Sequence, residues 1–159
     1  MKFSKVKSVA FTGHRSVPYA QKGIVRFRLQ NAVRKFYNNG YRVFYCGMAV
    51  GFDLLAAEVV LSLKDELKDI KLVAAVPFKN QYFKFTREDK KRYFEVLHKV
   101  DEVIILSEEY YKGCLLRRND FMLENCSSLI AFYNGEQKGG TYYTCKHAEE
   151  RRMPVLNIY

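Results

Sequence analysis

The sequence lacks the marks of several common protein classes. No apolar run approaches the roughly 20 residues that a membrane span needs. The basic N-terminus has neither the long apolar segment nor the small-residue cleavage site of a signal peptide. There is no internal repeat, low-complexity tract or linker. We therefore expect a cytoplasmic protein that does not interact with membranes.

Metal-binding and redox motifs are also missing. The four cysteines form no C-x-x-C pair, and no cluster of Cys and His has zinc spacing. Cys46 ends an apolar run, where cysteine acts as a small hydrophobe. We predict reduced, structural thiols at Cys46, Cys114, Cys126 and Cys145, and no metal site.

Acidic residues are absent from the first 50 positions. This segment holds ten Lys and Arg residues, whereas residues 51–159 hold 17 residues of each sign, so it carries the whole net charge of +10. Such asymmetry is typical of proteins that bind an anionic ligand or a polyanionic partner. A solvated basic helix face is the simpler interpretation, and charge alone leaves both open.

Length and pattern predict one α/β domain over residues 1–159. Short apolar runs predict strands at 7–12, 42–46, 71–76, 102–106, 129–133 and 154–158. Apolar stripes with helical spacing lie between them, within 25–36, 52–67, 86–98, 116–126 and 142–152. This alternation predicts a three-layer, Rossmann-like, doubly wound and mostly parallel sheet with strand 7–12 in a central position.

Polar or glycine-containing loops follow every predicted strand except the last, at 12–15, 47–53, 77–81, 110–119 and 135–141. Because the carboxyl ends of parallel strands share one edge, these loops should converge on one crevice. Gly47, Gly51 and Asp53 open one helix, and Gly139, Gly140 and Thr141 open another. Free N–H groups at such helix starts favour a phosphate. Tight turns, a dipole-complementing Asp53 and an N-cap at Thr141 are the structural alternatives.

Charged side chains add candidates for chemistry. His14 could act as a general acid, and Arg15 could bind phosphate in a bidentate manner. Arg118 and Asn119 could reach the crevice from the opposite side, or Arg118 could be solvated. Glu58 is either the partner of a cation or part of the polar surface. Neither G-x-G-x-x-G nor G-x-x-x-x-G-K-[ST] is present, so NAD-type and P-loop assignments lack support.

Six motifs in this order resemble the YpsA-like branch of the SLOG superfamily over about 150 residues. They are Phe11-Thr12-Gly13-His14-Arg15, Gly47-x-Ala49-x-Gly51-Phe52-Asp53 with Ala56-Ala57-Glu58, Pro77-Phe78-x-x-Gln81, Arg118-Asn119-x-x-Met122, Tyr133-Asn134-Gly135 and Gly139-Gly140-Thr141-x-x-Thr144. The resemblance implies a bacterial, Rossmann-like protein related to Smf/DprA and to the LOG phosphoribohydrolases. It further implies a sensor or regulator that binds a nucleotide derivative similar to NAD or ADP-ribose.

The residues expected to bind this nucleotide or phosphate are Thr12, Gly13, His14, Arg15, Gly47, Ala49, Gly51, Asp53, Pro77, Arg118, Asn119, Gly139, Gly140, Thr141 and Thr144. No other cofactor is expected. The sequence is compatible with a homo-oligomer but does not specify one.

One departure from the related hydrolases matters. LOG-type enzymes carry a catalytic Glu where this chain has Thr144, and a hydroxyl cannot replace a carboxylate as a base near pH 7. An N-glycoside hydrolase is thus an alternative only if Asp53 or Glu58, with His14 as an auxiliary, supplies the acid or base. A single-stranded nucleic-acid binder is a further alternative, supported by the basic first segment and its aromatic residues Phe27, Phe36, Tyr37 and Tyr41.

Overall fold

A six-stranded sheet forms the centre of the molecule. In the computed structural model, which describes residues 2–159, all neighbouring strands pair in parallel, in the order β4-β3-β2-β1-β5-β6. The strands are β1 Ser8–Gly13, β2 Val43–Cys46, β3 Lys71–Val76, β4 Glu102–Ile105, β5 Ser128–Phe132 and β6 Val155–Asn157. The predicted α/β class and the inner position of the first strand are both confirmed.

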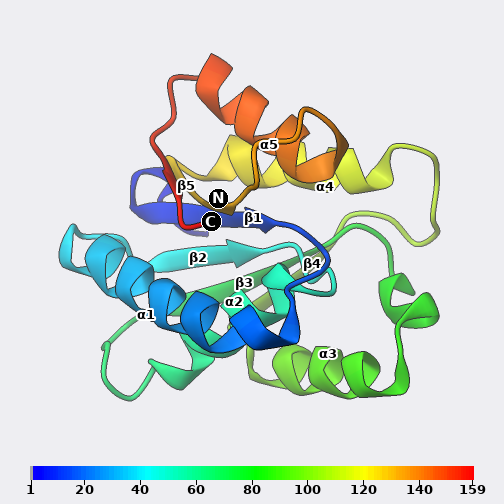
Figure 1. Cartoon of the computed structure of the whole chain (residues 1–159), viewed down its shortest axis with the longest axis horizontal. Helices are drawn as coiled ribbons and strands as arrows, with labels where there is room; N and C mark the ends of the chain where they lie inside the picture. Colours follow the sequence, from blue (N-terminus) through cyan, green and yellow to red (C-terminus); the bar gives the residue numbers. More distant parts are fainter. Residues whose placement is uncertain (1) are drawn as a thin grey trace.

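Helices cover both faces of this sheet and complete three layers (Figure 1). One face carries α1 Lys22–Asn38, α2 Phe52–Ser62 and α3 Arg87–Lys99, and the other carries α4 Cys114–Asn125 and α5 Gly139–Glu150. Each face has its own buried core, the larger of the two under α1, α2 and α3. Within residues 2–159, no helix has both the length and the apolar content that crossing a bilayer requires.

Local sequence signals account for most element boundaries. The hydroxyl of Thr86 accepts a hydrogen bond from the Asp89 N–H at 3.1 Å, which confirms the predicted N-cap of α3. Gly40 follows α1 with φ +95°, in the left-handed region that favours glycine. The prediction that the second helix extends to Leu67 was wrong. It ends at Ser62, whose hydroxyl donates to the Val59 carbonyl and thereby competes with the helical backbone bonds.

The chain reverses its winding direction beside β1. After β1 it proceeds through β2 and β3 to β4 at one edge, then returns to β5 on the other side of β1. The loops that follow β1 and β5 therefore leave the sheet toward opposite helix layers. In open α/β sheets, ligands bind in the crevice that such a switch point creates at the carboxyl ends of the strands.

Candidate functional site

A cavity of about 500 Å³ lies at this switch point. It collects residues from four segments that are far apart in sequence: the end of β1 with its loop, the start of α2, α4, and the start of α5. The predicted ligand-binding residues that line it are Thr12, Gly13, His14, Arg15, Ala49, Asp53, Arg118, Asn119, Gly139, Gly140 and Thr141. The remaining predicted residues, Gly47, Gly51, Pro77 and Thr144, are not part of this lining.

Two glycines allow the loops after β1 and β2 to pack together. A Cβ at Gly13 would lie 2.4 Å from the Phe52 ring. Gly51 has φ +81°, and a Cβ there would lie 2.2 Å from the Arg15 carbonyl oxygen. The Phe52 N–H also donates to the His14 carbonyl at 3.1 Å. Gly51 thus permits close approach of two backbones, and its contact with Arg15 connects it to the cavity that Gly140 lines.

Buried groups of opposite charge flank Gly47 at the floor of the cavity. Arg118 is 4% exposed and Asp53 is 6% exposed, so the alternative of a solvated Arg118 was wrong. Arg118 donates from Nη1 to the Gly47 carbonyl and from Nε to the Asn119 side-chain oxygen, the latter at 2.8 Å. A Cβ at Gly47 would lie 2.8 Å from the guanidinium carbon and 2.9 Å from a carboxylate oxygen of Asp53. A side chain at position 47 would therefore displace the ends of these two charged side chains.

Burial shifts the protonation of both groups toward their neutral forms. It raises the pKa of Asp53 to about 6, although the Arg118 charge and the Ala49 N–H, which donates to the carboxylate at 3.2 Å, act in the opposite direction. Burial likewise lowers the pKa of Arg118, while the negative charge of Asp53 counteracts that shift. Asp53 therefore changes protonation close to neutral pH, which suits either hydrogen bonding or acid–base chemistry.

A second layer of side chains fixes the Gly47 carbonyl. Gln81 donates to this oxygen at 3.0 Å, and the Tyr93 hydroxyl donates to the Gln81 side-chain oxygen at 3.1 Å. From the sequence, Gln81 belonged only to a motif of the family resemblance, and Tyr93 only to the predicted helix 86–98. Nothing in the local sequence around either residue indicates a hydrogen-bond chain to the Gly47 carbonyl, which lies more than 30 residues away in sequence.

The start of α5 lines the cavity with Gly139, Gly140 and Thr141, and the first N–H groups of a helix have no partner within it. The helix begins at Gly139, with Lys138 as an N-cap that makes no side-chain bond. Thr141 is the third helical residue, so the alternative that it caps the helix was wrong. The Asn119 amide nitrogen approaches within 3.7 Å of the position a Gly140 Cβ would occupy. Thr144 is buried, and its hydroxyl donates to the Gly140 carbonyl at 2.9 Å.

Two of the three candidate catalytic side chains already have a hydrogen-bond or ion-pair partner within the protein. His14 accepts the Asn134 N–H at Nε2, 2.9 Å away, and packs edge-on against Phe132. Glu58 forms a two-point ion pair with Arg92, at 2.6 and 3.1 Å. Asp53 lines the cavity and forms no salt bridge among residues 2–159.

Comparisons with known proteins agree with this fold. Two solved structures superpose on nearly the whole chain. DNA processing protein A from Helicobacter pylori has a TM-score of 0.66 at 19% identity, and TM1055 has a TM-score of 0.60 at 16% identity. They cover 96% and 94% of this chain, which itself spans 64% of the former protein and 72% of the latter. At these identities the similarity establishes the fold.

Sequence comparison establishes the family. A UPF0398 protein of Shouchella clausii is 30% identical over 82% of this chain and 68% of its own length. The UPF0398 protein YpsA of Bacillus subtilis is 26% identical over 80% of this chain and 72% of its own. The YpsA family model, described as the YspA SLOG family, matches residues 9–156. The chain therefore belongs to the YspA SLOG family.

Proposed function

We propose that the switch-point cavity binds the phosphoribosyl part of a nucleotide derivative, and that the protein acts as a sensor or regulator. The observation that carries the proposal is the buried Arg118 guanidinium, which lines the cavity beside Asp53. A buried cation is costly unless it is paired or receives an anion. Asp53 supplies only part of that compensation, because within residues 2–159 no carboxylate oxygen lies within 4 Å of an Arg118 guanidinium nitrogen.

The arrangement of donors suits a phosphate at the start of α5. Backbone N–H groups of Gly139 and Gly140, the amide of Asn119 and the guanidinium of Arg118 surround the same space. Helix N-termini attract anions through these free N–H groups and the helix dipole. Asp53 is an acceptor in the same cavity and would receive hydrogen bonds from sugar hydroxyls.

Isothermal titration against AMP, ADP-ribose, NAD and cyclic dinucleotides tests the proposal. We expect at least one of these ligands to bind with measurable heat and to raise the melting temperature. A ligand at 100 times its Kd adds about 2.7 kcal/mol to the free energy of unfolding. No heat and no thermal shift across the whole panel would contradict the proposal.

The same ligands test for hydrolysis. Asp53 has a pKa of about 6 and could serve as a general acid or base, whereas His14 and Glu58 are already engaged. Release of free base by the wild type, abolished in Asp53→Asn, would establish an N-glycoside hydrolase. Binding without release of base supports the sensor role.

A second candidate function is the binding of single-stranded nucleic acid. DNA processing protein A from Helicobacter pylori, which shares this fold, has a single-stranded DNA binding mode. In this chain, α1 exposes Phe27 among the basic residues of a segment that lacks acidic ones. An electrostatic mode predicts affinity for oligonucleotides that falls steeply as salt rises. Salt-independent binding, or none at low salt, would remove this candidate.

A further inference from the structure

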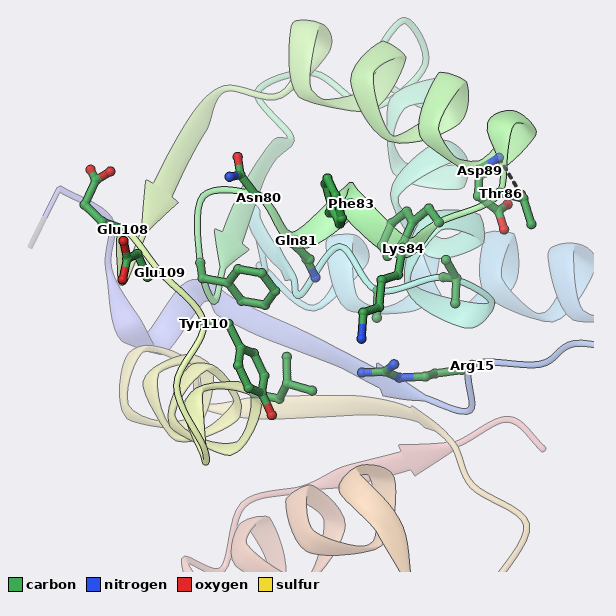
Figure 2. Close-up of a pocket in the computed structure, with 15 residues that line it drawn as sticks. Arg15, Asn80, Gln81, Phe83, Lys84, Thr86, Asp89, Glu108, Glu109 and Tyr110 are labelled. Atoms are coloured by element: carbon green, nitrogen blue, oxygen red, sulfur yellow. Dashed lines mark hydrogen bonds between the residues drawn. The ribbon is translucent and has the colours of Figure 1, made fainter.

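A larger cavity of about 740 Å³ adjoins the switch-point cavity. The two share Arg15, Ala49, Tyr110 and Leu115 as lining residues, so one molecule can extend from one to the other. The larger cavity lies between the segment that follows β3 and the loop that follows β4 (Figure 2). We refer to it as the aromatic cavity.

Aromatic rings dominate the walls of this cavity. Phe78, Phe83, Phe85 and Tyr110 line it, and the rings of Phe78 and Tyr110 meet edge-on with centroids 5.4 Å apart. Phe83 is 72% exposed and Tyr110 is 62% exposed, which leaves their rings free to contact a ligand. Exposed aromatic rings around a hollow are the arrangement that proteins use to stack planar bases.

Two cations line the aromatic cavity, and one of them, Arg15, also lines the switch-point cavity. Figure 2 shows the side chains of Lys84 and Arg15 pointing toward one another from opposite walls. Neither forms a salt bridge with a carboxylate within the described residues 2–159. Three carboxylates also line the cavity. Asp89 pairs with Arg92 at 3.2 Å and Glu108 with Lys79 at 3.9 Å, and Figure 2 shows Glu108 and Glu109 at the end of the cavity away from Arg15 and Lys84. Two cations that face one another and form no salt bridge favour a ligand with electron-rich acceptors between them.

From these observations we infer that the aromatic cavity is the base-binding subsite of the nucleotide site proposed above. The phosphoribosyl group occupies the switch-point cavity, and the planar heteroaromatic base passes Arg15 and stacks among Phe78, Phe83 and Tyr110. Arg15 and Lys84 donate hydrogen bonds to the ring nitrogens of the base or to an adjoining phosphate. The inference rests on the proposed function and adds to it that the base contributes directly to affinity.

Two ligands that differ only by the base can test the base subsite separately from the phosphoribosyl site. Ribose 5-phosphate and AMP share one phosphoribosyl group and differ by the adenine base. Stacking of a base on aromatic side chains should make AMP bind about 5- to 150-fold more tightly than ribose 5-phosphate. Phe83→Ala should remove at least about fivefold of AMP affinity and leave ribose 5-phosphate binding unchanged, because Phe83 lines only the aromatic cavity.

Phe27→Ala is the matched control. Phe27 is 61% exposed, lies on α1 and lines none of the cavities at the crevice. Its replacement should alter neither affinity. The two proteins bearing substitutions at exposed positions should both fold, which circular dichroism checks directly.

The affinities for the two ligands decide between the base subsite and the phosphoribosyl site. Equal affinity for the two ligands, or AMP binding that is unaffected by Phe83→Ala, would overturn the base subsite and leave the phosphoribosyl site standing. Failure of both ligands to bind, together with no heat and no thermal shift across the panel named above, would overturn the proposed function itself. If another nucleotide of that panel binds instead, wild-type affinity for it in Phe83→Ala would overturn the base subsite. A loss of affinity in Phe27→Ala equal to that in Phe83→Ala would also count against the inference.

Discussion

Replacement of Arg118 by Met is the perturbation that should weaken ligand binding most selectively. Met keeps much of the apolar volume of the side chain but removes its charge and its bonds to Gly47 and Asn119. A hydrogen bond between charged groups contributes about 1.5–3 kcal/mol. Loss of one such bond to a phosphate should therefore raise the Kd of AMP about 10- to 150-fold. The Gly47 carbonyl keeps its bond from Gln81, so the fold should survive.

Arg117→Met is the control for this experiment. Arg117 is the preceding residue of α4, its side chain is 49% exposed, and it pairs with Glu124 at 3.8 Å. It does not line the cavity, so AMP affinity should change by less than about twofold. Arg118→Lys should give an intermediate loss, because lysine keeps the charge but not the planar fork. Titration calorimetry measures all three. Wild-type affinity in a folded Arg118→Met protein would refute the reasoning.

Two further predictions concern stability. Gly51→Ala should lower the free energy of unfolding by more than about 1–3 kcal/mol, because a strained positive φ combines with the contact to Arg15, whereas Gly23→Ala in α1 should raise it by about 0.5–1 kcal/mol. Urea unfolding of both variants checks this, and equal effects would contradict the close-approach role of Gly51. Because the pKa of Asp53 is raised from 3.8 to about 6, the unfolded chain releases this proton at lower pH than the folded chain. The free energy of unfolding should therefore fall by about 2.4 kcal/mol as pH rises from 4 to 7. Asp53→Asn should remove this contribution to the pH dependence of the free energy of unfolding. If the wild type and Asp53→Asn instead differ by the same free energy at pH 4 and pH 7, the pKa of this carboxyl group is not raised.

The architecture could be predicted because it is encoded in local patterns. The continuous apolar run of residues 71–76 indicates a strand buried on both faces, and β3 has those bounds. Alternation of such runs with helical stripes leaves few topologies, and the shared edge of parallel strands then brings the loops together. Most of the cavity lining follows from this rule, including Arg118 and Asn119 on the far side of the switch point.

The parts that escaped prediction depend on tertiary contacts. Gly47 was expected to face a ligand, but its carbonyl accepts bonds from Arg118 and Gln81, which lie far away in sequence. Thr144 falls one turn after Gly140, and its hydroxyl bonds back to that carbonyl within the helix. The aromatic cavity was predicted only in part. Loops 77–81 and 110–119, which supply Phe78 and Tyr110, were expected at the crevice, whereas Phe83 lies beyond them in a short 3-10 helix, Gln81–Lys84, that no local pattern indicated.

A backbone NMR titration with AMP tests the central claim most directly, since a chain of 18.7 kDa is accessible to this method. The claim is that loops after β1 and β5 receive the phosphoribosyl group at the switch point. We predict that the amide resonances of Gly13–Arg15 and Gly139–Thr141 shift most, with smaller changes around Phe83 and Tyr110. Shifts confined to the basic face of α1, or spread without preference over the chain, would contradict the account.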